Sequence, residues 1–424
     1  MVKYASDCMM KSCFDGYKRY VNPYVVDFLK SIELDIVFNK AEGCYIFDSN
    51  NTAYLDFVSG FGAMTLGHNH PELIKKMKNI LDFSMPNINP WGIVPDTALL
   101  AEKLVGYTKR KMEKVYFASS GSEAVESALK FALACTGRKA FIAINNGFHG
   151  LTLTATALAG NCIWKKRLPE FSVEVDHVDI NDVNKIEELF LKKSYAGIII
   201  EPVQGSSGMG IWHSEYFKEV ARLAKKHKVM LILDEVMTGL GRTGMWFAYQ
   251  KILPELSPDI IVISKGLTGG LIPISAVLMT NKVYTGMFGG KAMGGGHGAT
   301  FSGNALGIAC ALATLNIIEN DKLIDNVDVV SHYINKKLLE LKSNGFPIGN
   351  ISIIGLSVGF EVIFMDSKKY LTAASEVCLK LTKNKVFTTL APHNHHYIRL
   401  TPPLNTSLHD VDNFINALER SMYV

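Results

Sequence analysis

Short apolar runs recur along the middle of the chain, and more polar, helix-like segments separate them. Six runs of four or five residues are predicted to be strands: 115–118, 140–144, 196–200, 229–233, 260–264 and 275–279. Continuous apolar strands that alternate with helices are typical of a mostly parallel sheet with helices on both faces. The pattern therefore predicts an α/β fold for this part of the chain.

The C-terminal part has a different pattern. Apolar residues three or four positions apart predict a long amphipathic helix over 322–342. Strands are predicted at 351–364 and 396–400, and Ser407 with Asp410 resembles a capping box that starts a last helix. We expect the N-terminal segment to return to one of two lobes. The predicted parts are an N-terminal segment, a large domain and a smaller α+β domain: residues 1–60, 61–320 and 321–424.

Charge and hydropathy narrow the class of protein. A formal charge of +4 over 424 residues is too dilute to indicate nucleic acid or an anionic membrane as a partner. The longest apolar stretch, 306–318, is too short to span about 30 Å of hydrocarbon. The N-terminus lacks the apolar core of a secretory signal. We therefore expect neither nucleic-acid binding nor membrane binding.

The cysteines and histidines indicate which cell compartment suits the chain and whether it binds a metal ion. The seven cysteines are scattered without a C-x-x-C pair, which argues against a disulfide framework or a zinc site. The histidine-rich run 393–396 has no carboxylate or cysteine beside it, so no metal site is predicted there. A reducing cytoplasm is the simplest setting.

Small polar and ionisable residues follow the predicted strands. In an open parallel sheet, ligands bind beyond the carboxyl ends of the strands. Those ends carry Ser120-Gly121-Ser122, Phe148-His149-Gly150, Glu201, Asp234 and Lys265. A buried charge is costly unless it is paired, so several charges at one sheet edge predict a shared polar site. The alternative is that each charge reaches water separately.

The stretch from Ser120 to Ser122 directly precedes a helix predicted over 122–135. Its N–H groups and hydroxyls would lie at the positive end of the helix dipole, which favours phosphate. Alanines that recur every four residues would let this helix lie close to the sheet. A simple cap by Ser120 or Ser122 explains the same residues, so the stretch alone leaves both interpretations open.

A phosphate site, an acid and a lysine together indicate one cofactor. Pyridoxal phosphate needs a phosphate cradle, a lysine that forms its imine and a carboxylate beside the pyridine nitrogen. Asp234 is suited to hold that nitrogen protonated, and Phe148 is suited to stack on the ring. Lys265 is suited to form the imine and then to carry a proton. We therefore predict pyridoxal phosphate as the cofactor.

Eight motifs in order extend this interpretation over nearly the whole chain. They are "YLDFVSGFGAMTLGHNHPEL" (54–73), "SSGSEA", "GFHG", "EPVQG" (201–205), "LILDEVMTGLGRTG" (231–244), "ISKGLTGG" (263–270), "GATFSGN" (298–304) and "IRLTPPL" (398–404). In these motifs the chain resembles the class-III aminotransferases, in the fold-type-I group of pyridoxal-phosphate enzymes. The resemblance implies a mostly parallel, seven-stranded sheet in the large domain and an aminotransferase activity.

The resemblance also implies roles for the residues at the strand ends. Lys265 would be the Schiff-base lysine, and Asp234 would be the partner of the pyridine nitrogen. The other implied cofactor-binding residues are Ser120, Gly121 and Ser122 at the phosphate, Phe148 and Val236 on the two ring faces, and His149 and Glu201 beside the cofactor. No acid–base role is assigned to His149.

Two further residues concern the partners of the chain. The resemblance implies that Thr300 reaches the phosphate of the neighbouring subunit, in a homodimer with shared active sites. It also implies that Arg399 clamps the substrate α-carboxylate with two parallel hydrogen bonds. Without the resemblance, a surface arginine in a salt bridge is the alternative for Arg399. The sequence does not distinguish a dimer from a tetramer.

Three positions depart from the ornithine and acetylornithine branch of this family. Leu151 stands where that branch usually has an arginine for the distal carboxylate of glutamate. Ser206 stands where it usually has a glutamate that masks the substrate arginine, and Met237 where a glutamine is frequent. A charge-assisted contact contributes about 1.5–3 kcal/mol. Without a cation at position 151, this contact to 2-oxoglutarate is lost. We therefore expect this chain to depend less on 2-oxoglutarate than the ornithine-type enzymes do.

The substrate pocket is predicted to be apolar. Phe61, Met64 and Trp91 lie in segments that line the substrate entrance in the family that the chain resembles, and Leu151 is also assigned to the substrate. An amine, amino aldehyde or acyl-chain aldehyde suits such a pocket better than a compact diacid. Ordinary packing is the alternative role for these side chains. The sequence leaves open whether the substrate is free or carried on a protein.

The favoured function is a two-step aminotransferase, which takes nitrogen from a donor amine and passes it to a carbonyl acceptor such as a keto acid. An aminomutase or decarboxylase on the same fold, or an ornithine-type 2-oxoglutarate aminotransferase, is the alternative. The Lys265–Asp234 pair argues against a non-catalytic binding protein. The lack of a G-x-G-x-x-G after the first strand argues against a nicotinamide dehydrogenase.

Overall fold

The central element of the molecule is a twisted sheet, seen in a computed structural model that describes residues 7–88, 93–160, 163–166, 168, 173–290, 296–363 and 373–422. Within these ranges the sheet has seven strands in the order β4-β12-β11-β10-β7-β5-β6. Their bounds are β4 Lys114–Ala118, β5 Ala140–Ile144, β6 Glu174–Val178, β7 Tyr195–Ile200, β10 Met230–Asp234, β11 Ile260–Ile263 and β12 Ser275–Met279. Only β12 runs antiparallel to its neighbours. The predicted α/β class with a mostly parallel sheet is confirmed.

All six predicted runs are strands of this sheet. The run predicted to end at residue 264 ends one residue earlier, because the backbone of Ser264 (φ −162°, ψ −135°) turns out of the strand. The seventh strand, β6, was not predicted. It lies at the sheet edge, and four of its five residues are partly or fully exposed, so it lacks the continuous apolar run of the buried strands.

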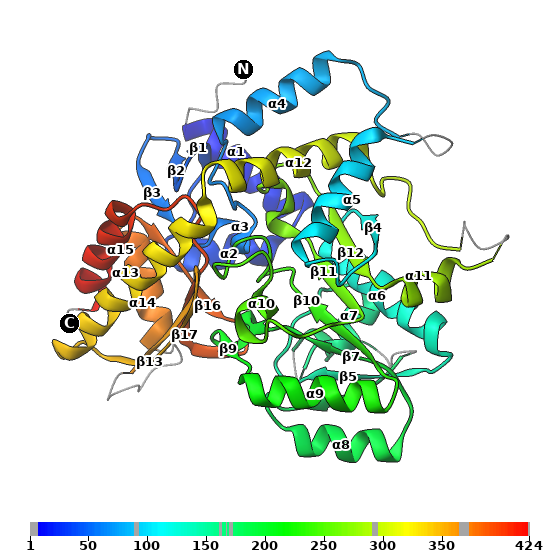
Figure 1. The fold of residues 1–424 in the computed structure, drawn as a ribbon. Coiled ribbons are helices and arrows are strands. Elements are labelled where there is room, and N and C mark those ends of the chain that lie inside the picture. The colour runs from blue at the N-terminus through cyan, green and yellow to red at the C-terminus, as the bar shows by residue number, and fades with distance from the viewer. Residues whose placement is uncertain are drawn as a thin grey trace.

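Alternate residues of each strand enter opposite hydrophobic clusters, as the two faces of a sheet require. In β5, Ile142 and Ile144 join one cluster, whereas Phe141 and Ala143 join the other. Helices on the first side are α5 (Pro95–Tyr107), α8 (Val183–Lys192), α9 (Ser214–Lys226), α10 (Ala248–Ile252) and α12 (Ala305–Asn320). Helices on the second side are α6 (Gly121–Thr136), α7 (Leu153–Leu158) and α11 (Asn281–Phe288). Figure 1 shows α8 and α9 side by side below the sheet.

The C-terminal part forms a second, antiparallel sheet in the order β13-β14-β17-β16. Its elements are α13 (Leu323–Ser343), β13 (Ile348–Ile354), β14 (Ser357–Val362), α14 (Ala373–Lys383), β16 (Thr389–Ala391), β17 (Asn394–Leu400) and α15 (Leu408–Met422). The strand prediction for 351–364 was wrong in its bounds, because Gly355 (φ 56°) turns the chain into a hairpin that begins at Ile348; residue 364 lies outside the described residues. The predicted capping box is confirmed, since Asp410 N donates to Ser407 Oγ (3.1 Å) and Ser407 N to Asp410 Oδ2 (2.9 Å).

The N-terminal segment contributes strands to the C-terminal lobe. It begins with helices α1 (Asp7–Tyr20) and α2 (Pro23–Ser31), followed by β1 (Phe38–Glu42), β2 (Tyr45–Asp48) and β3 (Ala53–Asp56). Strand β3 pairs in parallel with β15 (Val386–Phe387), and Leu55 and Phe57 share a core with C-terminal residues. The short turn α3 (Ser59–Gly62) and helix α4 (Pro71–Asp82) then lead into the large lobe. The exact domain limits stay a prediction. None of the described helices is long and apolar enough to cross a membrane.

Candidate active site

A cavity of about 170 Å³ lies beyond the carboxyl ends of the parallel strands. It is where an open parallel sheet binds its ligands. All the predicted cofactor-binding residues except Thr300 line it: Ser120, Gly121, Ser122, Phe148, His149, Glu201, Asp234, Val236 and Lys265. Met237, one of the three unusual positions, lines it too. The structure thus brings together residues from five separate strand ends.

One wall of the cavity is the tight start of α6. Ser120 is extended (φ −147°) and caps the helix, since its Oγ accepts the N–H of Glu123 (3.2 Å). The N–H groups of the next two residues have no acceptor within the helix. A Cβ on Gly121 would lie 3.2 Å from the Val236 side chain, and a Cβ on Gly150 (φ +120°) would lie 2.2 Å from Ser122 Oγ. Gly121 and Gly150 therefore allow close packing around the N–H groups at the start of α6.

Asp234, at the end of β10, is oriented by two hydrogen bonds. Its Oδ2 lies 2.8 Å from His149 Nδ1, and its Oδ1 accepts the N–H of Val236 (3.1 Å). Burial opposes a charge on His149, but the hydrogen bond and the charge of Asp234 outweigh it and raise the pKa of this imidazole. The other ring nitrogen, His149 Nε2, is buried without a partner among the described residues. His149 thus keeps an anionic carboxylate in place.

Lys265 follows β11 and begins a short 3₁₀ turn, η3 (Lys265–Thr268). Burial, aided by the charge of Arg399, lowers the pKa of Lys265 to about 8. Burial likewise raises the pKa of Glu201 to about 7, and Glu201 Oε1 accepts the N–H of Phe148 (2.8 Å). Near neutral pH the cavity therefore holds an amine and an acid that both exchange protons readily.

Arg399 lies in β17, on the antiparallel sheet, next to this cavity. Its Nη1 donates to the carbonyl of Gly205 (3.0 Å), and a Cβ on Gly205 would lie 3.1 Å from Met237, which lines the cavity. The guanidinium carbon is 5.7 Å from the centre of the Phe61 ring. Ser206 donates to the carbonyl of Asn146 (2.7 Å).

The other predicted substrate residues are only partly gathered here. Phe61 is 51% exposed and contacts Arg399, whereas Leu151 is 59% exposed. Trp91 lies outside the described residues. An aromatic residue that we did not predict, Trp164, packs edge-on against Phe148 (5.2 Å between ring centroids). No sequence pattern around Trp164 signals this contact, because Trp164 lies in a short 3₁₀ turn, Ile163–Lys165, that directly follows none of the predicted strands.

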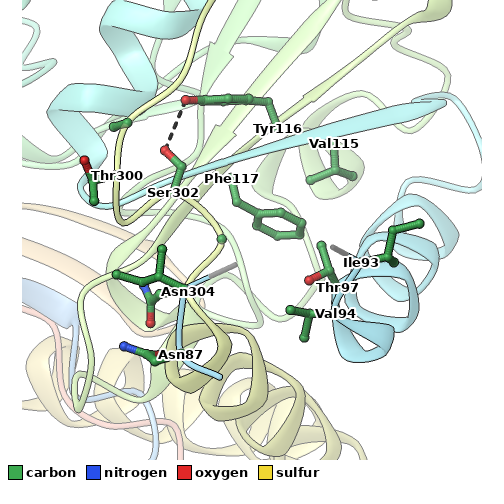
Figure 2. Close-up of a pocket in the computed structure, with 13 residues that line it drawn as sticks. Asn87, Ile93, Val94, Thr97, Val115, Tyr116, Phe117, Thr300, Ser302 and Asn304 are labelled. Atoms are coloured by element: carbon green, nitrogen blue, oxygen red, sulfur yellow. Dashed lines mark hydrogen bonds between the residues drawn. The ribbon is translucent and has the colours of Figure 1, made fainter. Parts of the chain in front are cut away.

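Thr300 lies in a different cavity of the same chain. That cavity measures about 690 Å³, and Figure 2 shows Thr300 and Ser302 on one side of it and Ile93, Val94 and Thr97 on the other. Neither Lys265 nor the start of α6 lines it. Within one chain, Thr300 therefore does not line the Lys265 cavity.

Comparison with known proteins decides the family. The family model of class-III aminotransferases matches residues 30–422. The chain is a class-III aminotransferase. It is similar to an acetylornithine aminotransferase of Archaeoglobus fulgidus, with 32% identity over 90% of this chain and 94% of that protein. It is also similar to aminotransferase PigE of a Serratia species, with 29% identity over 97% of this chain and 53% of that protein, so the chain spans about half the length of PigE.

The solved structures agree with the family and indicate the cofactor. An amine transaminase from an uncultivated Pseudomonas species, described as bound to pyridoxal phosphate, matches with a TM-score of 0.83 and 27% identity over 91% of this chain and 94% of that one. Class-III aminotransferases use pyridoxal phosphate, and this enzyme depends on it. The cavity fits that cofactor: free N–H donors suit its phosphate, an anionic carboxylate suits its pyridinium, and Val236 and Phe148 offer apolar surfaces.

Proposed function

We propose that this aminotransferase moves an amino group between a primary amine or aldehyde-type substrate with an apolar chain and an amino-acid or keto-acid partner. The observation that carries this proposal is Arg399, a buried cation without an ion-pair partner among the described residues, which lies against the aromatic ring of Phe61. Arg399 provides for one carboxylate. Phe61 and Met237 provide for an apolar chain.

The residues around the cavity have distinct roles in the proposed reaction. Ser120, Gly121 and Ser122 would hold the cofactor phosphate, Asp234 its pyridine nitrogen, and Phe148 and Val236 its ring. When bound, pyridoxal phosphate supplies an electron sink for the pair released at the substrate carbon. Lys265 would hold the cofactor and move the proton, since a pKa of about 8 leaves a usable fraction of neutral amine.

Two residues would act by positioning others. His149 holds the Asp234 carboxylate at 2.8 Å, and Glu201 fixes the backbone N–H of Phe148 at 2.8 Å. Both lie in the buried part of the cavity. They therefore keep the partner of the pyridine nitrogen and the ring-stacking residue in fixed orientations.

The second carboxylate of a diacid has no cation at the predicted position. Leu151 is exposed and apolar there. An ornithine-type 2-oxoglutarate aminotransferase is one alternative, and the acetylornithine relative supports it. An aminomutase or decarboxylase on the same fold is the other alternative. We favour the monocarboxylic partner over these alternatives because Arg399 provides for one carboxylate and Leu151 provides no cation for a second. A cytoplasmic location remains a prediction.

A comparison of acceptors tests the proposed substrate class. With one apolar amine as donor, we expect kcat/KM to be higher for pyruvate than for 2-oxoglutarate. The variant Leu151→Arg should raise kcat/KM for 2-oxoglutarate roughly tenfold or more, because a charge-assisted contact contributes at least about 1.5 kcal/mol. Leu153→Arg, at a residue of similar exposure (60%), is the matched control. A strong preference of the unaltered enzyme for 2-oxoglutarate would refute the proposal.

We also propose that the working unit is a homodimer with shared active sites. Thr300 supports this, since the loop that carries it lines a cavity separate from Lys265 in its own chain. Several large apolar side chains near this loop and cavity are exposed in the single chain: Ile88, Ile93, Leu99 and Phe301. A second copy of the chain would cover such a surface and bring its Thr300 to the phosphate of its partner.

A further inference from the structure

Arg399 is a buried cation with an incomplete set of polar partners. It is 5% exposed, and its Nη1 donates to Gly205 O at 3.0 Å. Its Nε has no acceptor, and no carboxylate forms an ion pair with it, among the residues that the structure describes. A buried charge in this condition is costly. The guanidinium is therefore ready for an incoming carboxylate.

The neighbour that covers this guanidinium is the aromatic ring of Phe61. The guanidinium carbon lies 5.7 Å from the ring centre, within the range of a cation–π contact. The ring is also half exposed, at 51%, so the ring meets Arg399 on one side while much of it is open to solvent. An aromatic ring attracts a cation far more weakly than a carboxylate does.

The backbone that presents Phe61 is unusual and firmly held. Four consecutive residues of α3 are left-handed: Ser59 (φ 48°), Gly60 (φ 59°), Phe61 (φ 57°) and Gly62 (φ 84°). For a bulky residue such as phenylalanine this conformation is strained and persists only when its surroundings impose it. Strain of this kind often marks a functional position.

The surroundings that impose the turn include the strand exit after Arg399. Thr401 donates its N–H to Phe57 O (2.8 Å) and its hydroxyl to Val58 O (2.8 Å). Asp56 accepts the N–H groups of Val58 (3.0 Å) and Ser59 (2.8 Å). The backbones on both sides of the Phe61–Arg399 contact are thus tied together by hydrogen bonds.

We propose that Phe61 is a neutral cover for Arg399, in a chain where Ser206 cannot serve as a charged one. This inference rests on the proposed function and refines it. With an apolar amine in the site, the ring stays over the guanidinium and contacts the amine's chain. With a keto acid in the site, the ring turns aside and the carboxylate takes the guanidinium. One pocket then accepts both substrates without an ion pair between Arg399 and a protein carboxylate among the described residues.

The two half-reactions of the Phe61→Ala holoenzyme test this role. We expect the apparent KM for an apolar amine such as hexylamine to rise roughly two- to fivefold, and that for pyruvate to fall by a similar factor. Phe61→Tyr, which keeps the ring, should restore both values. Phe28→Ala, which removes another exposed aromatic ring outside the site, should leave both unchanged. A merely structural role of Phe61 would not shift the two KM values in opposite directions.

Two results would overturn the inference. One is a Phe61→Ala KM for pyruvate that rises or stays the same; the other is a parallel rise for both substrates. Calorimetric binding of propionate, a carboxylate without a long apolar chain, to the same holoenzymes gives a readout without turnover: Phe61→Ala should bind it tighter, and weaker or equal binding would refute the cover. If no amine reacts even with the unaltered enzyme, the proposed function fails, while this binding comparison still decides the role of Phe61.

Discussion

At the scale of single residues, the proposed chemistry depends on how burial changes the pKa of Lys265. An exposed lysine is almost fully charged at neutral pH and reacts slowly with an aldehyde. In this cavity burial disfavours the cation and lowers the pKa to about 8, although Asp234 and Glu201 oppose the shift. The result is an amine that is partly neutral at the pH of the cell.

This lowered pKa predicts how the cofactor-free protein takes up pyridoxal phosphate. Lys265 reacts only when neutral, so its rate should rise with pH and level off above about pH 8. An exposed lysine would continue to gain rate towards about pH 10.4. The measurement is the appearance of cofactor absorbance from pH 6 to 10, with N-acetyl-lysine amide as the control for the cofactor's own ionisations. A protein profile that parallels the control would contradict the shift.

Residue patterns in the sequence indicate most of the cavity but not the orientation of its side chains. Lys265, Asp234 and Glu201 are visible because each ends an apolar run, and the sheet edge brings such ends together. The hydrogen bond between His149 and Asp234 and the contact of Trp164 with Phe148 depend on tertiary packing. The Arg399–Phe61 contact joins residues far apart in the chain, and no local pattern signals it.

At the scale of elements, helix α6 combines a structural cap with a predicted phosphate site. Ser120 accepts the N–H of Glu123, and Glu123 Oε2 in turn accepts the N–H of Ser119 (2.9 Å). The helix then buries its alanine-rich face, including Ala124, against the sheet. The two interpretations that the sequence left open for this stretch are therefore compatible.

The cap makes a prediction about stability that separates Ser120 from Ser122. Ser120→Ala should lower the free energy of unfolding of the cofactor-free protein by about 1 kcal/mol, because the N–H of Glu123 loses its acceptor. Ser122→Ala removes a hydroxyl that makes no cap, and should cost less than about 0.5 kcal/mol. Urea denaturation measures both. Equal losses in the two variants would contradict the assignment of the cap.

The elements that the sequence predicted best are those with the strongest periodicity. The buried strands and the long helix α13 are found within one or two residues of the predicted bounds. Strand β6 escaped prediction because an edge strand alternates rather than running continuously apolar. The sequence predicts one strand segment at 351–364 where the structure has a hairpin around Gly355. Both strands of the hairpin are apolar, and a single glycine is a weak signal for the turn.

At the scale of the whole molecule, the proposed site joins parts of the chain that lie far apart in sequence. The large lobe supplies the cavity around Lys265, and the antiparallel sheet supplies Arg399. The N-terminal segment pairs with β15 and ends in the turn that carries Phe61. In the proposed homodimer a second copy adds Thr300. Because the proposed substrate site draws on all these parts, we expect a change in their relative placement to alter substrate binding before it alters cofactor binding.

The central claim is that Lys265, in the cavity at the carboxyl edge of the sheet, holds the cofactor and moves the proton during amino transfer. The most direct measurement is the visible spectrum of the purified enzyme, first with an apolar amine and then with pyruvate. We predict a cofactor band that the amine removes and pyruvate restores. Lys265→Ala should still bind the cofactor through the start of α6 but complete this cycle at least about 100-fold more slowly. A Lys265→Ala enzyme that cycles at the normal rate would contradict the claim.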